Sequence, residues 1–261
     1  MSSKTSPTHD IVIVAPIQRY PFFRECLKSL SKCNFGDRIV NIHIGIVDDE
    51  QFKDVLNYPT KIDLNFLKEI NGLKIYYFKK NHYPKNLNHI FRQCSGDYVI
   101  KVDDDVVFED KKWLIKYENV LTSLDLGFVA MANRRKIIDS VNGIGLCETF
   151  TGSVMMISRM VIDKIGYWNE EYGPFLWEDL DYKERAKISG FKFKYICRHS
   201  NCGVKMYHCE TFSGCPEDYK KLINNSSKYL YQNVIEMKNK SHHLILDNFK
   251  KYEKGIGLYC K

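Results

Sequence analysis

Three consecutive aspartates, Asp103 to Asp105, lie between the apolar runs Tyr98–Val102 and Val106–Phe108. Asp is disfavoured in strands, and three neighbouring carboxylates repel one another, so another group must offset their charge. The length and branched residues of the first run predict a buried strand, and open α/β sheets bind their ligands at the carboxyl ends of such strands. A divalent cation with a phosphate-bearing ligand would offset the charge. The triplet alone leaves an acidic surface turn as the alternative.

Two earlier apolar runs have the composition of central strands in a parallel sheet. Ile11–Pro16 is apolar until proline stops it, and Ile39–Val47 is β-branched and followed by Asp48, Asp49 and Glu50. Apolar residues at helical spacing over 20–31 follow the first run and begin a βαβ unit. This alternation predicts an α/β fold with a Rossmann-like, mostly parallel sheet flanked by helices. Further strands are predicted at 73–78, 98–102, 127–132, 149–158, 191–197 and 204–208, and helices at 51–72, 86–94, 113–124, 159–166 and 175–186.

A second group of acids lies at the start of the helix predicted over 175–186. Trp177 is followed there by Glu178, Asp179 and Asp181. Acids at a helix N-terminus interact favourably with the helix dipole, so part of this pattern is ordinary capping. Capping stabilises a helix by about 1 kcal/mol and does not require three acids and a tryptophan at one end. The surplus of carboxylates indicates a functional site.

Composition narrows the class of protein. The net charge of +7 comes from 39 basic and 32 acidic residues that are interspersed along most of the chain, so no basic tract predicts nucleic-acid binding. Nine cysteines without paired spacing are typical of reduced thiols in a cytosolic protein. The sequence shows no apolar stretch long enough for a signal peptide or a membrane span, so we expect a soluble, cytoplasmic protein.

The order and spacing of these motifs are more specific than any one of them. From Ile11 to His208 the chain resembles the inverting glycosyltransferases of the family-2 type with the GT-A fold. The resemblance rests on Asn88, eight residues before Gly96, and on the segments IVIVAP, IVDDE, GDYVIKVDDD, TGSVMMISRMVIDKIGYWNEEYG and WEDLDYKERAKISGFKFKY.

The resemblance implies an enzyme and a division of the chain. The expected activity is metal-dependent transfer of a sugar, with inversion, from a nucleotide-diphosphate sugar to a hydroxyl of a glycan or glycoconjugate, with a UDP-sugar as the favoured donor. Residues 11–215 would form the GT-A catalytic domain, with a nucleotide-binding half at 11–108 and an acceptor-binding half at 109–215. A polar leader at 1–10 precedes it, and a helical, Lys-rich extension at 216–261 follows.

The chemistry of this transfer gives the acidic motifs separate tasks. Cleavage builds charge on the leaving diphosphate, which a bound cation stabilises. Asp105, with Asp103 directly or through water, is expected to hold Mn²⁺ or Mg²⁺. Asp104, on the opposite pleat of a strand-like run, should point away or bond backbone amides. The acceptor hydroxyl needs a base on the opposite face of the sugar, and the resemblance assigns that role to Asp179.

The resemblance also implies the donor site. Ala15, Pro16 and Ile17 would form a loop under the base, with Tyr20 stacking on it. After Pro16 the chain departs from the family's small polar pattern. Arg19, Lys85 and Arg92 are candidates to neutralise phosphate, with solvated surface cations as the alternative. The donor-binding residues are expected to be Ala15, Pro16, Tyr20, Asp48, Asp49, Lys85, Asn88, Asp103 and Asp104.

For the acceptor, the expected residues are Gly152, Trp177 and Glu178. Trp168 is either a second aromatic platform or part of the core. The resemblance makes His208 a third metal ligand, whereas a lone histidine is more often structural. The cysteines and histidines of residues 197–215 contain no C-x-x-C spacing, which disfavours a zinc site.

Two other functions agree less well with the sequence. A sugar-phosphate nucleotidyltransferase would carry a Gly-rich, basic loop after the first strand, where this chain has Ala15 and Pro16. A non-catalytic sugar-nucleotide-binding module would lack one carboxylate cluster, yet all are present. The donor sugar, the acceptor, the oligomeric state and a peripheral membrane contact through residues 216–261 stay open.

Overall fold

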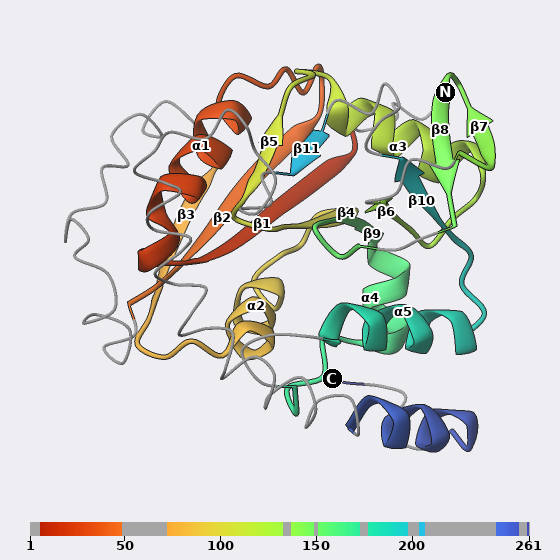
Figure 1. Cartoon of the computed structure of the whole chain (residues 1–261). Coiled ribbons are helices and arrows are strands. Elements are labelled where there is room, and N and C mark those ends of the chain that lie inside the picture. Colours follow the sequence, from red (N-terminus) through yellow and green to blue (C-terminus); the bar gives the residue numbers. More distant parts are fainter. Residues whose placement is uncertain are drawn as a thin grey trace.

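The structure is a computed structural model that describes residues 6–48, 72–132, 137–148, 151–172, 177–197, 204–206, 244–255 and 260; the side chains of Gln18, Tyr20, Pro21 and residues 204–206 are left out. Strands and helices alternate along the chain as predicted (Figure 1). The elements are β1 (Thr8–Pro16), η1 (Ile17–Arg19), α1 (Tyr20–Leu30), β2 (Ile39–Val47), β3 (Leu73–Phe78), α2 (Tyr83–Phe91), β4 (Tyr98–Val102), β5 (Val106–Phe108), α3 (Trp113–Ser123), β6 (Phe128–Ala132), β7 (Asp139–Val141), β8 (Ile144–Cys147), β9 (Val154–Ser158), α4 (Arg159–Ile165), α5 (Glu178–Ile188), β10 (Phe193–Cys197), β11 (Val204–Met206) and a helix at 244–253.

The described strands form a nine-stranded sheet in the order β3-β2-β1-β4-β9-β6-β10-β8-β7. Strands β3, β2, β1 and β4 are parallel to one another, and β6 and β10 are parallel to each other. Strand β9 runs antiparallel to both β4 and β6, and β8 runs antiparallel to both β10 and β7. All strands except β9 and β8 therefore point in one direction, which confirms the predicted mostly parallel α/β sheet.

Alternating side chains of β1 divide the core into two layers. Ile11 and Ile13 face the cluster that contains the buried residues of α1 and α3, and Val12 and Val14 face the cluster formed with α2, α4 and α5. Figure 1 shows these two sets of helices on opposite faces of the sheet. A strand that is buried on both faces has the continuous apolar sequence observed here.

A two-stranded antiparallel sheet lies beside the triple aspartate. Strand β5 pairs with β11, with Val106 opposite Met206 and Phe108 opposite Val204. The aspartates occupy the turn between β4 and β5, so the segment after β10 returns to this turn. The short strands β5, β7 and β8 have three or four residues each and were not predicted.

Several predicted boundaries were wrong for identifiable reasons. Strand β1 begins at Thr8, inside the predicted polar leader, because its polar side chains have buried partners: His9 Nε2 lies 3.1 Å from Glu118 Oε2, and Asp10 Oδ1 lies 3.1 Å from His43 Nε2. Strand β9 begins at Val154, so Gly152 lies in the preceding turn. The helix predicted at 51–72 lies outside the described residues. The division of the chain into halves and an extension stays a prediction.

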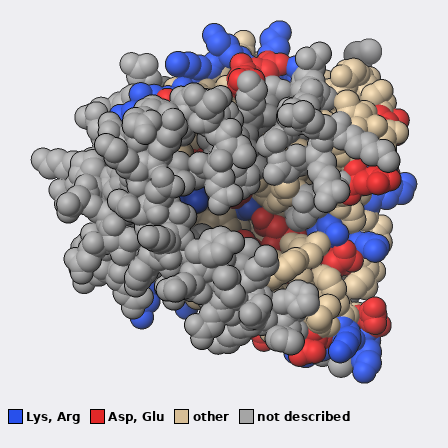
Figure 2. Space-filling view, in the orientation of Figure 1, with Lys and Arg blue, Asp and Glu red and all other residues tan. Residues whose placement is uncertain are grey.

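The described surface carries mixed charge. On the face in Figure 2, acidic and basic side chains are interspersed over the part that is coloured. None of the described helices is long and apolar enough to cross a membrane. The cytoplasmic location stays a prediction.

Candidate active site

The triple aspartate lies at the carboxyl edge of the parallel strands. Strands β1 and β4 are in register from His9 opposite Tyr98 to Ile13 opposite Val102, so the turn after Val102 lies beside the end of β1. The Asp103 amide donates to the Ser153 carbonyl at 2.8 Å, and the Val106 amide donates to the Asp103 carbonyl at 3.3 Å. These bonds fix a tight turn in place of a strand. Asp104 therefore does not lie on a continuing strand, and the prediction that it points away from the site or bonds backbone amides was wrong.

Arg19 binds the second and third aspartates together. Its Nε lies 2.8 Å from Asp104 Oδ2, and its Nη2 lies 2.9 Å from Asp105 Oδ2. Asp104 is 7% exposed and Asp105 is 5% exposed, so the two carboxylates are poorly solvated, whereas the Arg19 side chain is 35% exposed. Burial, together with the neighbouring Asp105 and Asp103, raises the pKa of Asp104 to about 7 although Arg19 opposes the shift. Asp104 thus points at a guanidinium instead of away from the site.

Lys101 joins the triple aspartate to the start of α5. It belongs to β4, its side chain is 2% exposed, and its Nζ lies 2.8 Å from Asp103 Oδ1 and 2.7 Å from Asp179 Oδ2. The same ammonium donates to the Gly152 carbonyl at 2.8 Å. Burial alone would lower the pKa of Lys101, but the two carboxylates raise it well above the usual value. The ammonium is therefore charged and has an acceptor for each of its three hydrogens.

Asp179 is held from a second side by an indole. Trp168 Nε1 donates to Asp179 Oδ1 at 2.8 Å, and the Trp168 ring stacks on Tyr182 with centroids 4.3 Å apart. Trp168 is 1% exposed, so it belongs to the core and is not an open acceptor platform. Burial raises the pKa of Asp179 more than Lys101 lowers it. A raised pKa makes a carboxylate a stronger base, which favours a role as general base.

Gly152 packs directly against the side chain of Asp179. A Cβ at residue 152 would lie 1.6 Å from Asp179 Oδ2 and 2.2 Å from its carboxyl carbon. No side chain fits in that space. The predicted residue is thus next to the site, and its glycine is explained by the close approach of Asp179.

The first residues of α5 are strained and buried. Trp177, the N-cap, has a φ of 74° in the left-handed region, which costs a non-glycine residue about 1 kcal/mol. Such strain is concentrated at functional sites. Glu178 is buried, its Oε2 has no hydrogen-bond partner among the described residues, and burial with the neighbouring Asp179 raises its pKa to about 8.

The site contains more carboxyl groups than cationic side chains. Its carboxyl groups are those of Asp103, Asp104, Asp105, Glu178 and Asp179, and the cations that contact them are Arg19 and Lys101. The raised pKa values of Asp104, Glu178 and Asp179 share one cause, which is burial beside other carboxylates. Oxygen donors of this kind are the ligands that Mg²⁺ and Mn²⁺ prefer. Asp103 and Asp105 could supply them, but Asp105 is paired with Arg19 here, and among the described residues only Asp10, His43 and Cys94 bring three possible ligand atoms within 4.8 Å of one another.

The structure places some of the expected donor residues at the same edge. Ala15 and Pro16 end β1 opposite Ile46 and Val47 of β2, and Asp48 follows directly, with its amide donating to the Phe78 carbonyl at 2.8 Å. Their roles stay predictions. Expected residues that lie outside the described part are Asp49, His208 and the side chain of Tyr20; of the cysteines and histidines considered for zinc, Cys197 alone is described and is buried in β10.

Asn88, Arg92 and Lys85 were expected to bind the donor or its phosphates, and in the structure they contact other groups or solvent. Asn88 Nδ2 donates to the Trp168 carbonyl at 2.8 Å, and Asn88 Oδ1 accepts from the Trp168 amide at 3.0 Å, so this side chain supports the loop that holds Asp179. Arg92 lies over the Tyr167 ring and 3.4 Å from Glu170. Lys85 is exposed on α2. The donor and phosphate roles of these residues stay predictions.

A second group of potential metal ligands, Asp10, His43 and Cys94, is a structural cluster. Asp10 Oδ2 accepts from the amides of Ser95 and Gly96 at 2.8 and 2.6 Å. Asp10 Oδ1 lies 3.1 Å from His43 Nε2 and accepts from Asn41 Nδ2 at 2.9 Å. Hydrogen bonds therefore satisfy the carboxylate without a metal. Asp10 is near the start of β1, at the opposite edge of the sheet from the triple aspartate.

Sequence reasoning missed the residues that connect the acidic motifs. Lys101 interrupts an otherwise apolar strand two residues before Asp103, and a buried lysine needs carboxylate partners. That interruption was the available signal. The sequence contained no comparable signal for the hydrogen bond from Trp168 to Asp179 or for the pairing of Arg19 with both Asp104 and Asp105.

Solved structures of other proteins share the fold of this chain. A mannosyltransferase from Pyrobaculum calidifontis, solved with GDP-Man and Mn²⁺, has a TM-score of 0.56 at 11% identity over 74% of this chain and 57% of its own. S. aureus TarS 1-349 with UDP has a TM-score of 0.51 at 16% identity, over 72% of this chain and 57% of its own. At these identities the likeness shows the GT-A fold, and the chain spans 57% of the length of each.

No curated protein matches the chain. The model of the family described as "Glycosyl transferase family 2" matches residues 11–200, more than half of the sequence. The match begins in β1 and includes the triple aspartate, Gly152 and the start of α5. The chain therefore belongs to glycosyl transferase family 2.

Proposed function

We propose that this protein transfers a sugar from a nucleotide-diphosphate sugar to a hydroxyl group of a glycan or glycoconjugate, with inversion at the anomeric carbon. The observation that carries the proposal is the Lys101 ammonium, which lies within 2.8 Å of Asp103 on the triple-aspartate turn and of Asp179 on α5. The turn that would bind a cation and the residue that would act as base thus lie on either side of one lysine at the carboxyl edge of the sheet, which supports the proposal.

The donor would bind over the ends of β1, β2 and β4. Ala15 and Pro16 would contact the base, and Asp48 would accept from the base or the ribose. Two solved structures of similar fold contain GDP-Man with Mn²⁺ and UDP, and another TarS 1-349 structure contains UDP-GlcNAc. These complexes support a nucleotide sugar as donor, and a UDP-sugar remains our first choice.

Asp105, with Asp103, would hold Mn²⁺ or Mg²⁺. A cation bound there would stabilise the charge that develops on the leaving diphosphate. The buried carboxylates of Asp104 and Asp105 already share Arg19, so this guanidinium must move when Asp105 binds a cation. Released from Asp105, Arg19 would be close enough to the edge of β1 to pair with phosphate.

Asp179 would act as the base. Its carboxylate would take the proton of the acceptor hydroxyl while that oxygen bonds to the anomeric carbon. The bond from that carbon to the diphosphate oxygen would break at the same time, and the nucleoside diphosphate would leave. Trp168 and Lys101 hold the two carboxylate oxygens in fixed directions, which orients the remaining lone pairs for proton transfer.

Calorimetry paired with a turnover assay tests these roles. A thermal-shift screen of nucleotide sugars, with and without Mn²⁺, first identifies the donor, since only a ligand of the native state raises the melting temperature. Asp105→Asn should then weaken Mn²⁺-dependent donor binding, and Asp179→Asn should retain binding and abolish transfer. Asp163→Asn, an exposed acid on α4, is the matched control. Wild-type turnover by Asp179→Asn would show that another group is the base.

A further inference from the structure

The helix at 244–253 packs on α5 with one face buried. Ile245, Asn248 and Tyr252 are each 2% exposed and recur at helical spacing. In Figure 1 this helix lies beyond α5, on the side away from the sheet. The buried face includes two polar side chains, and a buried polar group needs hydrogen-bond partners. Their partners show what the helix holds in place.

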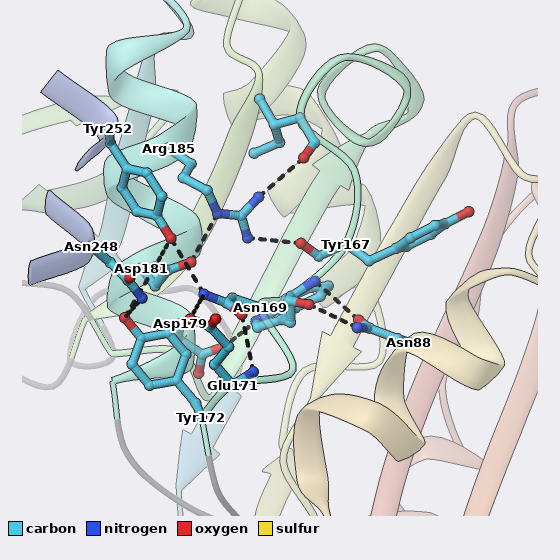
Figure 3. A network of polar contacts seen from close by, with 12 residues as sticks. Asn88, Tyr167, Asn169, Glu171, Tyr172, Asp179, Asp181, Arg185, Asn248 and Tyr252 are labelled. Carbon is cyan, nitrogen blue, oxygen red and sulfur yellow. Dashed lines mark hydrogen bonds and ion pairs between the residues drawn. The ribbon is translucent and has the colours of Figure 1, made fainter. Parts of the chain in front are cut away.

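Both polar side chains connect to one carboxylate. Tyr252 donates from its hydroxyl to Asp181 Oδ1 at 2.6 Å, and Tyr172 donates to the same oxygen at 3.1 Å. Asn248 Nδ2 donates to the Tyr172 hydroxyl at 3.3 Å. Figure 3 shows these side chains converging on Asp181 from the helix at 244–253, from the loop before α5 and from α5 itself. Asp181 lies two residues after Asp179 in the first turn of α5.

The other carboxylate oxygen of Asp181 pairs with Arg185. Arg185 in turn contacts the loop before α5. Arg185 Nε lies 2.8 Å from Asp181 Oδ2, and both residues are fully buried. Arg185 Nη2 donates to the Tyr167 carbonyl at 2.7 Å. The next residue along the chain is Trp168, whose indole donates to Asp179.

Cys260 contacts the same loop through backbone hydrogen bonds. The Cys260 amide donates to the Ile165 carbonyl at 3.0 Å, and the Tyr167 amide donates to the Cys260 carbonyl at 2.6 Å. Ile165 also accepts from Arg185 Nη1 at 3.1 Å. The helix at 244–253 and Cys260 therefore contact both supports of Asp179, which are the first turn of α5 and the loop that carries Trp168.

We propose that the helix at 244–253 is a positioning element for the acceptor base, with Tyr252 as its main positioning residue. This inference rests on the proposed role of Asp179. Tyr252 touches neither substrate nor base and acts through Asp181. Without its hydroxyl, Asp181 loses a hydrogen-bond donor, the ion pair of Asp181 with Arg185 is less firmly held, and the first turn of α5 gains freedom to shift. Proton transfer is sensitive to such shifts, because small misplacements far from the chemistry lower rates strongly.

Tyr252→Phe tests the inference because it removes one hydroxyl and keeps the ring in its buried place. We expect kcat to fall roughly tenfold while the donor dissociation constant stays at the wild-type value. The matched control is Leu246→Ala, an exposed position on the same helix. Rates are measured well below each melting temperature and divided by the number of donor-binding sites from calorimetry, so that loss of folded protein does not count as loss of rate.

Hydrogen exchange supplies a readout that does not depend on turnover. The Asp181 amide donates to the Trp177 carbonyl at 2.8 Å at the start of α5. Tyr252→Phe should speed exchange over residues 165–181 with little change over β1 and β4, and Leu246→Ala should change neither. If the helix only stabilises the fold, Tyr252→Phe would instead lower the melting temperature and leave kcat per donor site unchanged. That result would overturn the inference.

The same experiment separates the inference from the proposed function. An inactive Asp179→Asn together with an unimpaired Tyr252→Phe would reject the positioning role and leave the base assignment standing. A fully active Asp179→Asn would reject the base itself. If Tyr252→Phe fails to fold, Asn248→Ala removes the second polar contact of the helix and is held to the same expectation of a lower kcat at constant donor affinity.

Discussion

The Nζ atom of Lys101 lies 2.7 Å from Asp179 Oδ2 and 2.8 Å from Asp103 Oδ1. One buried ammonium therefore connects the proposed base on α5 to the proposed cation-binding turn after β4. Charges interact much more strongly in a buried site than in water, so the positions of the two carboxylates depend on each other through this lysine. The proposed donor side and the proposed acceptor side of the site therefore interact electrostatically through one residue.

Lys101→Met should be strongly destabilising. The substitution keeps an unbranched side chain but leaves Asp103 and Asp179 without their shared cation, and breaking a buried ion pair in this way costs about 3–5 kcal/mol. Urea unfolding at pH 7 measures the loss. Lys187→Met is the control, because Lys187 is exposed and its pairing with Glu184 at 3.7 Å is solvated. A loss no larger than in this control, which should stay within about 0.5 kcal/mol, would contradict the role of Lys101.

Gly152→Ala should displace Asp179. The added methyl group would occupy the position 1.6 Å from Asp179 Oδ2, so the carboxylate or the turn has to move. We expect roughly a hundredfold loss of kcat/KM, because the proposed base leaves its position relative to the acceptor.

The control for this substitution is Gly190→Ala. Its Cβ would meet nothing within 4 Å, although its φ of 88° makes alanine strained there. That variant should lose about 1 kcal/mol of stability and keep its turnover. Normal turnover in Gly152→Ala would mean that Asp179 has room to move without loss of function.

The sequence predicted the fold where local pattern and burial agree. The apolar runs of β1, β2 and β4 and the apolar spacing of α1 were sufficient because a parallel sheet buries its strands on both faces. Strands β7 and β8 are too short for a period-two pattern to be visible. The polar start of β1 was missed because its stability comes from Glu118 and His43, which are far away in the sequence.

For the site, motif spacing identified the carboxylates but not their partners. Asp103, Asp105 and Asp179 were selected from strand ends and a helix start, and the structure brings Asp103 and Asp179 to one lysine. The prediction for Asp104 was wrong because it assumed a continuing strand where the Ser153 carbonyl fixes a turn. Arg19 and Trp168 are brought to the acids by tertiary packing, which a linear pattern does not encode, whereas Lys101 is visible in the sequence only as a polar break in an apolar strand.

The Asp10 cluster predicts a pH-dependent term in stability. Burial alone would raise the pKa of Asp10, but hydrogen bonds from His43, Gly96 and Asn41 lower it from 3.8 to about 2. The carboxylate therefore stabilises the folded state at pH values above 3.8, and this contribution is lost as the pH falls toward 2. Near neutral pH it is about 2 kcal/mol.

The test compares the wild-type protein with Asp10→Asn by chemical unfolding between pH 7 and pH 2. The difference in unfolding free energy should be largest near pH 7 and should shrink below pH 4. Asp163→Asn, on the surface of α4, should track the wild type at every pH. A difference that stays constant down to pH 2 would show that the charge of Asp10 is not what stabilises the cluster.

Arg19→Gln should strengthen the binding of Mn²⁺. The guanidinium bonds to Asp104 and Asp105 at 2.8 and 2.9 Å and so competes with a cation for Asp105. Removing it leaves two buried carboxylates that repel each other, so the melting temperature without metal should fall. We expect roughly tenfold tighter Mn²⁺ binding by calorimetry, equivalent to about 1.4 kcal/mol, and a larger rise of the melting temperature when Mn²⁺ is added. Arg24→Gln, a partly exposed position on α1 whose arginine pairs with Glu25, should behave like the wild type in both measurements. Weaker Mn²⁺ binding in Arg19→Gln would mean that the guanidinium supports the metal instead of competing with it.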